Sequence, residues 1–153
     1  MCAAPRARAT RWPPVSSRPT WRPRRRRNRR WVPVLEGGQA EKPAILVLSC
    51  AGGRVEDEVL AGIEEEGVPS IVERPRTRAD AMELAQTAAG RSSLSVGVGI
   101  DAHGRVSVQQ DKLPAPLSEL ASDGPAEPVI ARILGHNAAR IVVGIPLRTE
   151  RLS

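Results

Sequence analysis

Phenylalanine and tyrosine are absent from these 153 residues, and all three tryptophans lie within residues 1–35. Residues 36–153 therefore contain no aromatic side chain, and their core must be built from Leu, Ile, Val, Ala and Met. Proteins that bind single-stranded nucleic acid stack the bases on aromatic side chains, and many interfaces use Trp and Tyr as anchors. The body of this chain can do neither, which leaves arginine and aliphatic side chains for partner contacts.

Cysteine, lysine and long apolar runs are also scarce. Two cysteines, Cys2 and Cys50, are too few for a disulfide framework, and no Cys/His cluster has the spacing of a zinc site. No run approaches the roughly 20 apolar residues of a membrane helix, and the start lacks the apolar region of a secretory signal. Neither lysine, Lys42 or Lys112, follows a glycine-rich phosphate loop. We expect a cytoplasmic chain with no membrane partner that does not hydrolyse ATP unaided.

The net charge of +6 is unevenly distributed. Residues 1–35 contain eleven arginines and no acidic residue, so residues 36–153 carry a net charge of −5. Proline recurs in the basic segment and apolar periodicity is absent, which is typical of disorder. We expect residues 1–41 to be a disordered Arg/Pro-rich tail and linker before a domain at 42–153. A basic arm that binds nucleic acid and an extension from an upstream start codon are the alternatives for the tail, and the first is disfavoured because its arginines lie on no folded surface.

Short apolar runs alternate with amphipathic segments after the tail. The runs predict strands at residues 44–49, 69–73, 94–100, 105–110 and 145–147. The amphipathic segments predict helices at residues 55–66, 77–89 and 126–143. Thr77 with Asp80 resembles a capping box, and Gly67, Gly90 and Gly144 are placed to end the three helices. This order predicts a three-layer α/β/α domain whose mostly parallel sheet has about five strands, one of them antiparallel.

The third predicted strand carries glycine at every second position. Gly97-Val-Gly99-Ile-Asp101-Ala matches a dinucleotide-binding fingerprint in form. A hairpin at residues 101–104 follows where that fingerprint requires a helix, so we reject the match. The bare strand face instead allows another segment to approach the backbone closely. No catalytic residue is expected, because Cys50 ends a buried strand and His103 belongs to a hairpin turn.

Three consecutive glutamates, Glu64, Glu65 and Glu66, end the first predicted helix. A helix C-terminus carries partial negative charge, so each carboxylate there is unfavourable by roughly 0.3–1 kcal/mol. Helical geometry places Glu66 at the border of the apolar face, whereas Glu65 projects away from it and is free to reach a cation or a partner. Carboxylate oxygens in this position suit a hard cation such as Mg²⁺. The alternative is a solvated acidic face.

The last predicted helix contains Asn137-Ala-Ala-Arg140 near its end. Its small residues allow close packing, and Arg140 complements the negative helix terminus. A role of Asn137 and Arg140 in an interface is the alternative to these local roles.

Three segments in order resemble the small subunits of diol and glycerol dehydratase reactivating factors. Residues 60–69 resemble the family's Leu-x-Gly-Ile-Glu-Glu-Glu-Gly-Ile-Pro, and residues 94–103 resemble its central strand with the following Asp-x-His. Residues 137–148 resemble its Asn-Ala-Ala-Arg-Leu-Val-x-Gly-Ile-Pro-Phe-Arg, with Leu147 in place of the Phe. The likeness covers residues 44–148, is poor at 111–124 and excludes the tail.

The resemblance implies a non-catalytic small subunit that works with a large ATPase subunit to free damaged cobalamin from a B12-dependent diol or glycerol dehydratase. ATP or ADP would be bound by the large subunit, and Mg²⁺ would be shared with it through the middle glutamate, Glu65. Glu64, Glu66, Asn137 and Arg140 are the candidates for the partner interface. The alternative is the small structural subunit of the dehydratase itself. The diol served, the stoichiometry and any association with a microcompartment are left open.

Overall fold

The computed structural model describes residues 42–114 and 117–149, so the predicted tail at residues 1–41 lies outside the described residues. In the described residues the strands are β1 (Ile45–Ser49), β2 (Ser70–Glu73), β3 (Val96–Ile100) and β4 (Val106–Gln110). The helices are α1 (Arg54–Glu65), α2 (Ala81–Arg91) and α3 (Pro128–Val143), with a short 3₁₀ helix at Ser118–Leu120. None of the described helices combines the length and the apolar character of a membrane span.

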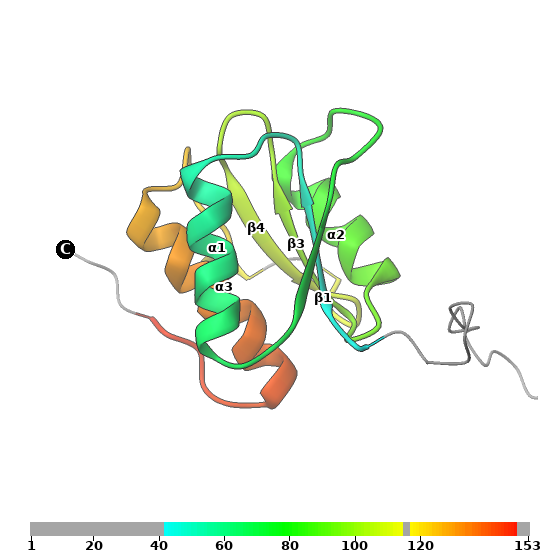
Figure 1. Ribbon diagram of the computed structural model, residues 1–153, viewed down its shortest axis with the longest axis vertical. Helices are drawn as coiled ribbons and strands as arrows, with labels where there is room; N and C mark the ends of the chain where they lie inside the picture. The colour runs from blue at the N-terminus through cyan, green and yellow to red at the C-terminus, as the bar shows by residue number, and fades with distance from the viewer. Residues whose placement is uncertain (1–41, 115–116, 150–153) are drawn as a thin grey trace, which may run out of the picture. The chain divides into compact units, whose positions relative to one another are not determined.

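The strands form one mixed sheet in the order β2-β1-β3-β4. β1 is parallel to both β2 and β3, and β4 is antiparallel to β3. Helix α2 covers one face of the sheet, and α1 with α3 covers the other (Figure 1). The three-layer α/β/α class with one antiparallel strand is therefore confirmed.

The number of strands differs from the prediction, because the described sheet has four strands and not five. Residues 145–147 do not pair with a strand. The Ile145 amide instead donates to the Arg140 carbonyl at 3.1 Å, and the Asn137 side chain holds the backbone of Arg148. The segment after α3 therefore packs against its own helix, which uses the backbone groups that an edge strand would offer to the sheet.

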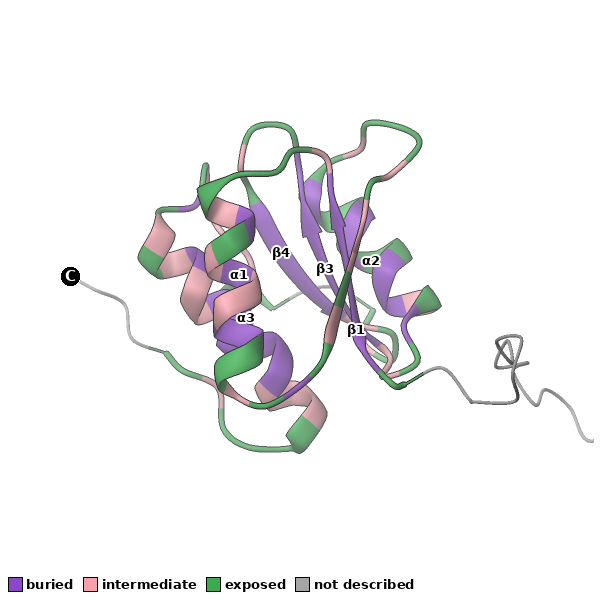
Figure 2. Ribbon diagram, in the orientation of Figure 1, coloured by how far each residue is buried: buried purple, intermediate pink, exposed green. Residues whose placement is uncertain are grey.

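The core is aliphatic, as the lack of aromatic residues required. All five residues of β1 are buried (Figure 2), and alternate side chains belong to the two different core clusters. Ile45 and Val47 pack in the cluster shared with α1 and α3, whereas Leu46 and Leu48 pack with α2. A strand buried on both faces explains the continuous apolar run in its sequence.

The glycines of β3 allow α2 to lie directly on the sheet. A Cβ at Gly97 would lie 2.1 Å from the amide nitrogen of Ala89, and one at Gly99 would lie 2.1 Å from the carbonyl oxygen of Ala81. Real Cβ atoms never come so close to backbone, so only glycine fits at either position. The interpretation of these glycines as a site of close backbone approach is confirmed, and β3 leads into the predicted hairpin with β4.

The helix ends were predicted with two errors, both in the second helix. Gly67 (φ 76°) follows α1 and Gly144 (φ 73°) ends α3, both in the left-handed conformation that glycine adopts readily. Thr77 was expected to cap the second helix, but Asp80 is the N-cap, and its side chain accepts from the Glu83 amide at 2.8 Å. Asp80 precedes Glu83 by three residues, the spacing of a capping box, just as Thr77 precedes Asp80. Of these two possible N-caps, the later one, Asp80, starts the helix. Gly90 lies inside α2 and does not end it.

Candidate functional site

Helices α1 and α3 touch through glycine, and this contact positions the candidate site. A Cβ at Gly62 of α1 would lie 2.2 Å from the carbonyl oxygen of Arg132. A Cβ at Gly135 of α3 would lie 2.2 Å from the carbonyl oxygen of Val59. Because the distance between packed helices depends on the side chains at the contact, two glycines bring these backbones together. The acidic end of α1 therefore lies beside the middle of α3.

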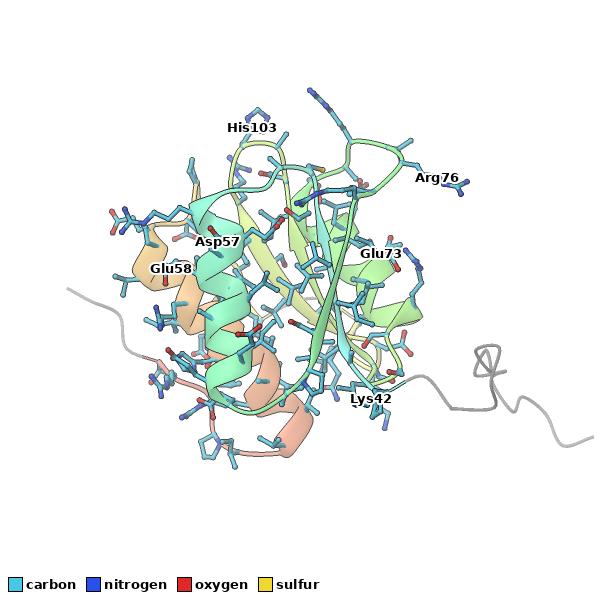
Figure 3. All side chains as sticks on the ribbon, viewed as in Figure 1. Lys42, Asp57, Glu58, Glu73, Arg76 and His103 are labelled. Atoms are coloured by element: carbon cyan, nitrogen blue, oxygen red, sulfur yellow. The ribbon has the colours of Figure 1, made fainter. Side chains whose placement is uncertain are left out.

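Glu65 is paired with a cation of the same chain. Its carboxylate accepts from Arg132 at both oxygens, from the guanidinium NH2 and, at 3.4 Å, from Nε. Arg132 also donates through NH1 to Glu58, at 2.8 Å, on the side of α1 that faces α3 (Figure 3). The hydrogen bonds from Arg132 lower the pKa of Glu65, and the same contacts with Glu65 and Glu58 raise the pKa of Arg132. The sequence predicted that Glu65 is free to reach a cation or a partner, and in the structure it contacts a cation of the same chain, Arg132 of α3.

Glu66 joins α1, α3 and the segment after α3. Its Oε1 accepts from Arg140 Nε at 2.9 Å and lies 2.9 Å from His136 Nδ1. Arg148 NH2 lies 3.7 Å from the same oxygen. The hydrogen bond from Arg140 is the main cause of the lowered pKa of Glu66, with a further contribution from His136.

His136 lies between the two carboxylates with only 6% of its side chain exposed. Its Nε2 is 3.0 Å from a Glu65 oxygen, and its Nδ1 is 2.9 Å from a Glu66 oxygen. An imidazolium donates to both carboxylates, whereas a neutral imidazole donates to only one. Arg132 and Arg140 offset within the chain the unfavourable charge expected at the C-terminus of α1, and His136 links the two carboxylates.

The other predicted interface residues divide into buried and exposed. Asn137 is completely buried: its Nδ2 donates to the carbonyl of Arg148 at 3.0 Å, and its Oδ1 accepts from the amide of Arg148 at 2.7 Å. Arg140 also donates to the Pro146 carbonyl at 3.0 Å. Both residues therefore hold the segment after α3 in place, which is the local role. Glu64 is exposed at the end of α1.

Three residues of this cluster were not identified from the sequence, namely Arg132, His136 and Arg148. A signal for two of them was present, because Arg132, His136 and Arg140 are spaced four residues apart and so share one face of a helix. The two arginines on this face of α3 are opposite in charge to the glutamates at the end of α1. The sequence alone does not show that the two meet. His103, by contrast, is exposed in the hairpin turn as expected, and Asp101 shapes that turn by accepting from the amides of His103 and Arg105.

Glu65 is exposed enough to reach a metal ion held by another chain. Its side chain is 44% exposed, and a carboxylate oxygen is a normal ligand for Mg²⁺. Among the described residues, no group of three or more His, Cys, Asp and Glu side chains is arranged to hold a metal ion. The donor set present fits one ligand contributed to a shared site.

Comparison with known proteins identifies the family. The dehydratase medium subunit family matches residues 42–148. The small subunit of the propanediol dehydratase-reactivating factor of Citrobacter freundii is 42% identical over 112 residues, which cover 69% of this chain and 90% of that protein. This chain belongs to the family of dehydratase-reactivating factor small subunits. The resemblance derived from three sequence segments is thereby confirmed.

Two solved structures support the same assignment at the level of the fold. A glycerol dehydratase reactivase superposes with a TM-score of 0.63 at 31% identity, over 70% of this chain and 97% of that chain. A diol dehydratase-reactivating factor complexed with ADP and Mg²⁺ superposes with a TM-score of 0.61 at 35% identity, over 71% and 99% of the two chains. A small subunit of a reactivating factor implies a large-subunit partner. The family description names a dehydratase subunit, whereas these relatives and structures are named as reactivating factors. The two names correspond to the two alternatives raised by the sequence, a reactivating-factor subunit and a subunit of the dehydratase itself.

Proposed function

We propose that this chain is the non-catalytic small subunit of a cytoplasmic factor that releases damaged cobalamin from a B12-dependent diol or glycerol dehydratase. ATP hydrolysis belongs to the large subunit. The observation that carries the proposal is the 42% identity to a reactivating-factor small subunit over 90% of its length. The α/β fold shared with two reactivating factors supports it further.

The proposed mechanism is an exchange of binding partners. ATP or ADP on the large subunit changes how tightly it holds this chain. The released chain or surface then competes for the dehydratase and opens a route for the damaged cofactor. Such exchange requires affinity that depends on the nucleotide, because a ligand that binds two states equally shifts neither.

The proposed contact with the large subunit centres on Glu65, as one ligand of a shared Mg²⁺. On this chain the carboxylate of Glu65 would hold the Mg²⁺, and the bound cation would neutralise the negative charge of that carboxylate. The complex of a related factor with ADP and Mg²⁺ supports this, as does the exposure of Glu65 at the end of α1. Glu66, His136 and Arg140 hold the end of α1 on α3 and so orient the carboxylate of Glu65. Exposed Glu64 lies beside it as the further candidate for the interface.

Reactivation of an inactivated dehydratase tests the function. Glycerol-inactivated enzyme should recover only when both reactivase subunits, ATP, Mg²⁺ and fresh coenzyme are present. Glu65→Gln should weaken Mg²⁺-dependent association with the large subunit at least about tenfold, since even changes around metal ligands have effects of this size. Glu73→Gln is the matched control, because Glu73 is 43% exposed, as Glu65 is 44% exposed, and is likewise paired with an arginine. Calorimetric titration measures both variants.

Two results would count against the proposal. Full reactivation in the absence of this chain would remove its assigned role. Co-purification in a tight complex with the catalytic subunit, with turnover of a diol, would support the alternative that it is a structural subunit of the dehydratase.

A further inference from the structure

The carboxylate proposed as a metal ligand is already occupied in this chain. Arg132 approaches both oxygens of Glu65 with two nitrogens of its guanidinium, the forked arrangement in which arginine binds carboxylates most strongly. His136 Nε2 lies 3.0 Å from the same group. A cation from another subunit must therefore compete with a cation of this one.

Arg132 and Mg²⁺ compete for the carboxylate of Glu65. The guanidinium already donates to both carboxylate oxygens, and a guanidinium and Mg²⁺ at contact distance repel each other. Coordination of Mg²⁺ by Glu65 is therefore favoured when the guanidinium moves away.

A second carboxylate provides the place to which Arg132 moves. Glu58 precedes Glu65 by seven residues, which is about two turns of α1 and places both on one face of the helix. Arg132 NH1 donates to Glu58 at 2.8 Å while its other nitrogens contact Glu65. The guanidinium therefore keeps one carboxylate partner when it gives up the other.

We infer that Arg132 is a competing counter-ion. It is paired with both Glu65 and Glu58 in the unassembled subunit, and it keeps only Glu58 when Glu65 binds the shared cation. The inference rests on the proposed function, because it concerns the same carboxylate. It adds a control on assembly: the subunit offers its ligand only to a partner whose cation displaces the arginine. Glu66 keeps its contacts with His136 and Arg140 throughout, so the end of α1 stays in place.

Two substitutions should act in opposite directions on binding of the full chain to the large subunit at subsaturating Mg²⁺ with ADP. Arg132→Gln should tighten binding about two- to fivefold, the range expected from loss of a competing exposed ion pair. Glu58→Gln should weaken binding about twofold, because Arg132 then has only Glu65 as a partner. The double variant should behave like Arg132→Gln, since without the guanidinium Glu58 has no function here. Arg91→Gln is the control for loss of an exposed, ion-paired arginine, at 52% exposure against 42% for Arg132.

The outcomes separate the two proposals. If Arg132→Gln leaves binding unchanged or weakens it, and EDTA still abolishes binding, the counter-ion role is overturned and the shared metal is retained. Binding of the unaltered chain that EDTA does not affect overturns the shared metal and the counter-ion role together. Tightening by Arg132→Gln with weakening by Glu58→Gln supports both.

Discussion

The two helical layers are attached to the sheet in different ways. Helix α2 lies on β3 through small residues and the bare positions Gly97 and Gly99, with apolar side chains between helix and sheet and one exposed ion pair at its end, Arg91 with Glu73. Helices α1 and α3, which lie side by side on the other face (Figure 1), also touch through glycine, but the end of α1 is in addition tied to α3 by the charged cluster around Glu65 and Glu66. At a close contact between backbones no residue larger than glycine fits, whereas a half-exposed carboxylate can exchange one cation for another. The first layer is suited to stability alone, and the second can also serve assembly.

The largest effect should come from filling the glycine contact beneath α2. Gly99→Ala places a methyl group against the backbone of α2, and we expect the free energy of unfolding to fall by about 3 kcal/mol, the upper end of the usual range for overpacking, because the neighbour is backbone. Gly90→Ala in the same helix is the control, because its nearest neighbour is a side-chain oxygen at 3.9 Å. It should raise the stability by about 0.5–1 kcal/mol, since glycine is a poor helix former. Denaturant unfolding measures both, and equal stability of the two variants would show that α2 can shift away from β3.

A smaller effect is expected in the other layer, from the buried amide that holds the segment after α3. Asn137→Ala removes both hydrogen bonds to the Arg148 backbone, and loss of a buried polar partner costs about 1–3 kcal/mol. Hydrogen exchange should show faster exchange of the Arg148 amide. Glu64→Gln, an exposed change nearby, should stay within about 0.5 kcal/mol of the unaltered chain. A slow Arg148 amide in Asn137→Ala would mean that other contacts hold the segment.

The smallest effect should be the dependence of stability on pH that the charged layer introduces. The pKa values of Glu65 and Glu66 lie below their ordinary value of 4.5, mainly because of Arg132 and Arg140. The folded chain therefore releases these protons at lower pH than the unfolded chain, so their contribution is complete above about pH 4.5 and is lost as the pH falls through the folded values. Glu56, whose pKa is lowered mainly by Arg74, adds a term of the same sign.

Urea unfolding between about pH 6 and about pH 3 measures this dependence. Arg140→Gln should make the decline shallower, whereas Arg91→Gln, outside the charged cluster, should leave it unchanged. A decline that is identical in all three proteins would show that the cluster contributes nothing to it.

Local patterns predicted much of the fold correctly. The apolar run of β1, the glycines after α1 and α3, and the hairpin between β3 and β4 were all placed to within two residues. The glycines and the hairpin depend on local backbone conformation, and β1 was recognised because burial on both faces requires a continuous apolar run. The errors arose where the sequence allowed more than one local conformation or more than one capping residue. Asp80 replaced Thr77 as the N-cap, and residues 145–147 packed on α3 where a fifth strand was expected. Which residue caps the helix, and whether a segment joins the sheet or packs on a helix, depends on the surrounding packing.

The candidate site was only half predicted. Its acidic residues were identified, since three glutamates at a helix C-terminus conflict with the helix dipole whatever surrounds them. The cation paired with Glu65 was missed, because Arg132 lies 67 residues from Glu65 along the chain. Asn137 was singled out by resemblance, but that its side chain is buried follows only from the structure.

The sequence by itself determined the aliphatic core, the order of helices and strands and the family, because composition, periodicity and short segments are properties of the chain as written. Only the tertiary structure decided that Glu65 and Glu66 have partners and which ones they are. The strength of a charge interaction depends on distance in space, and that distance is set where Gly62 and Gly135 allow two helices to meet.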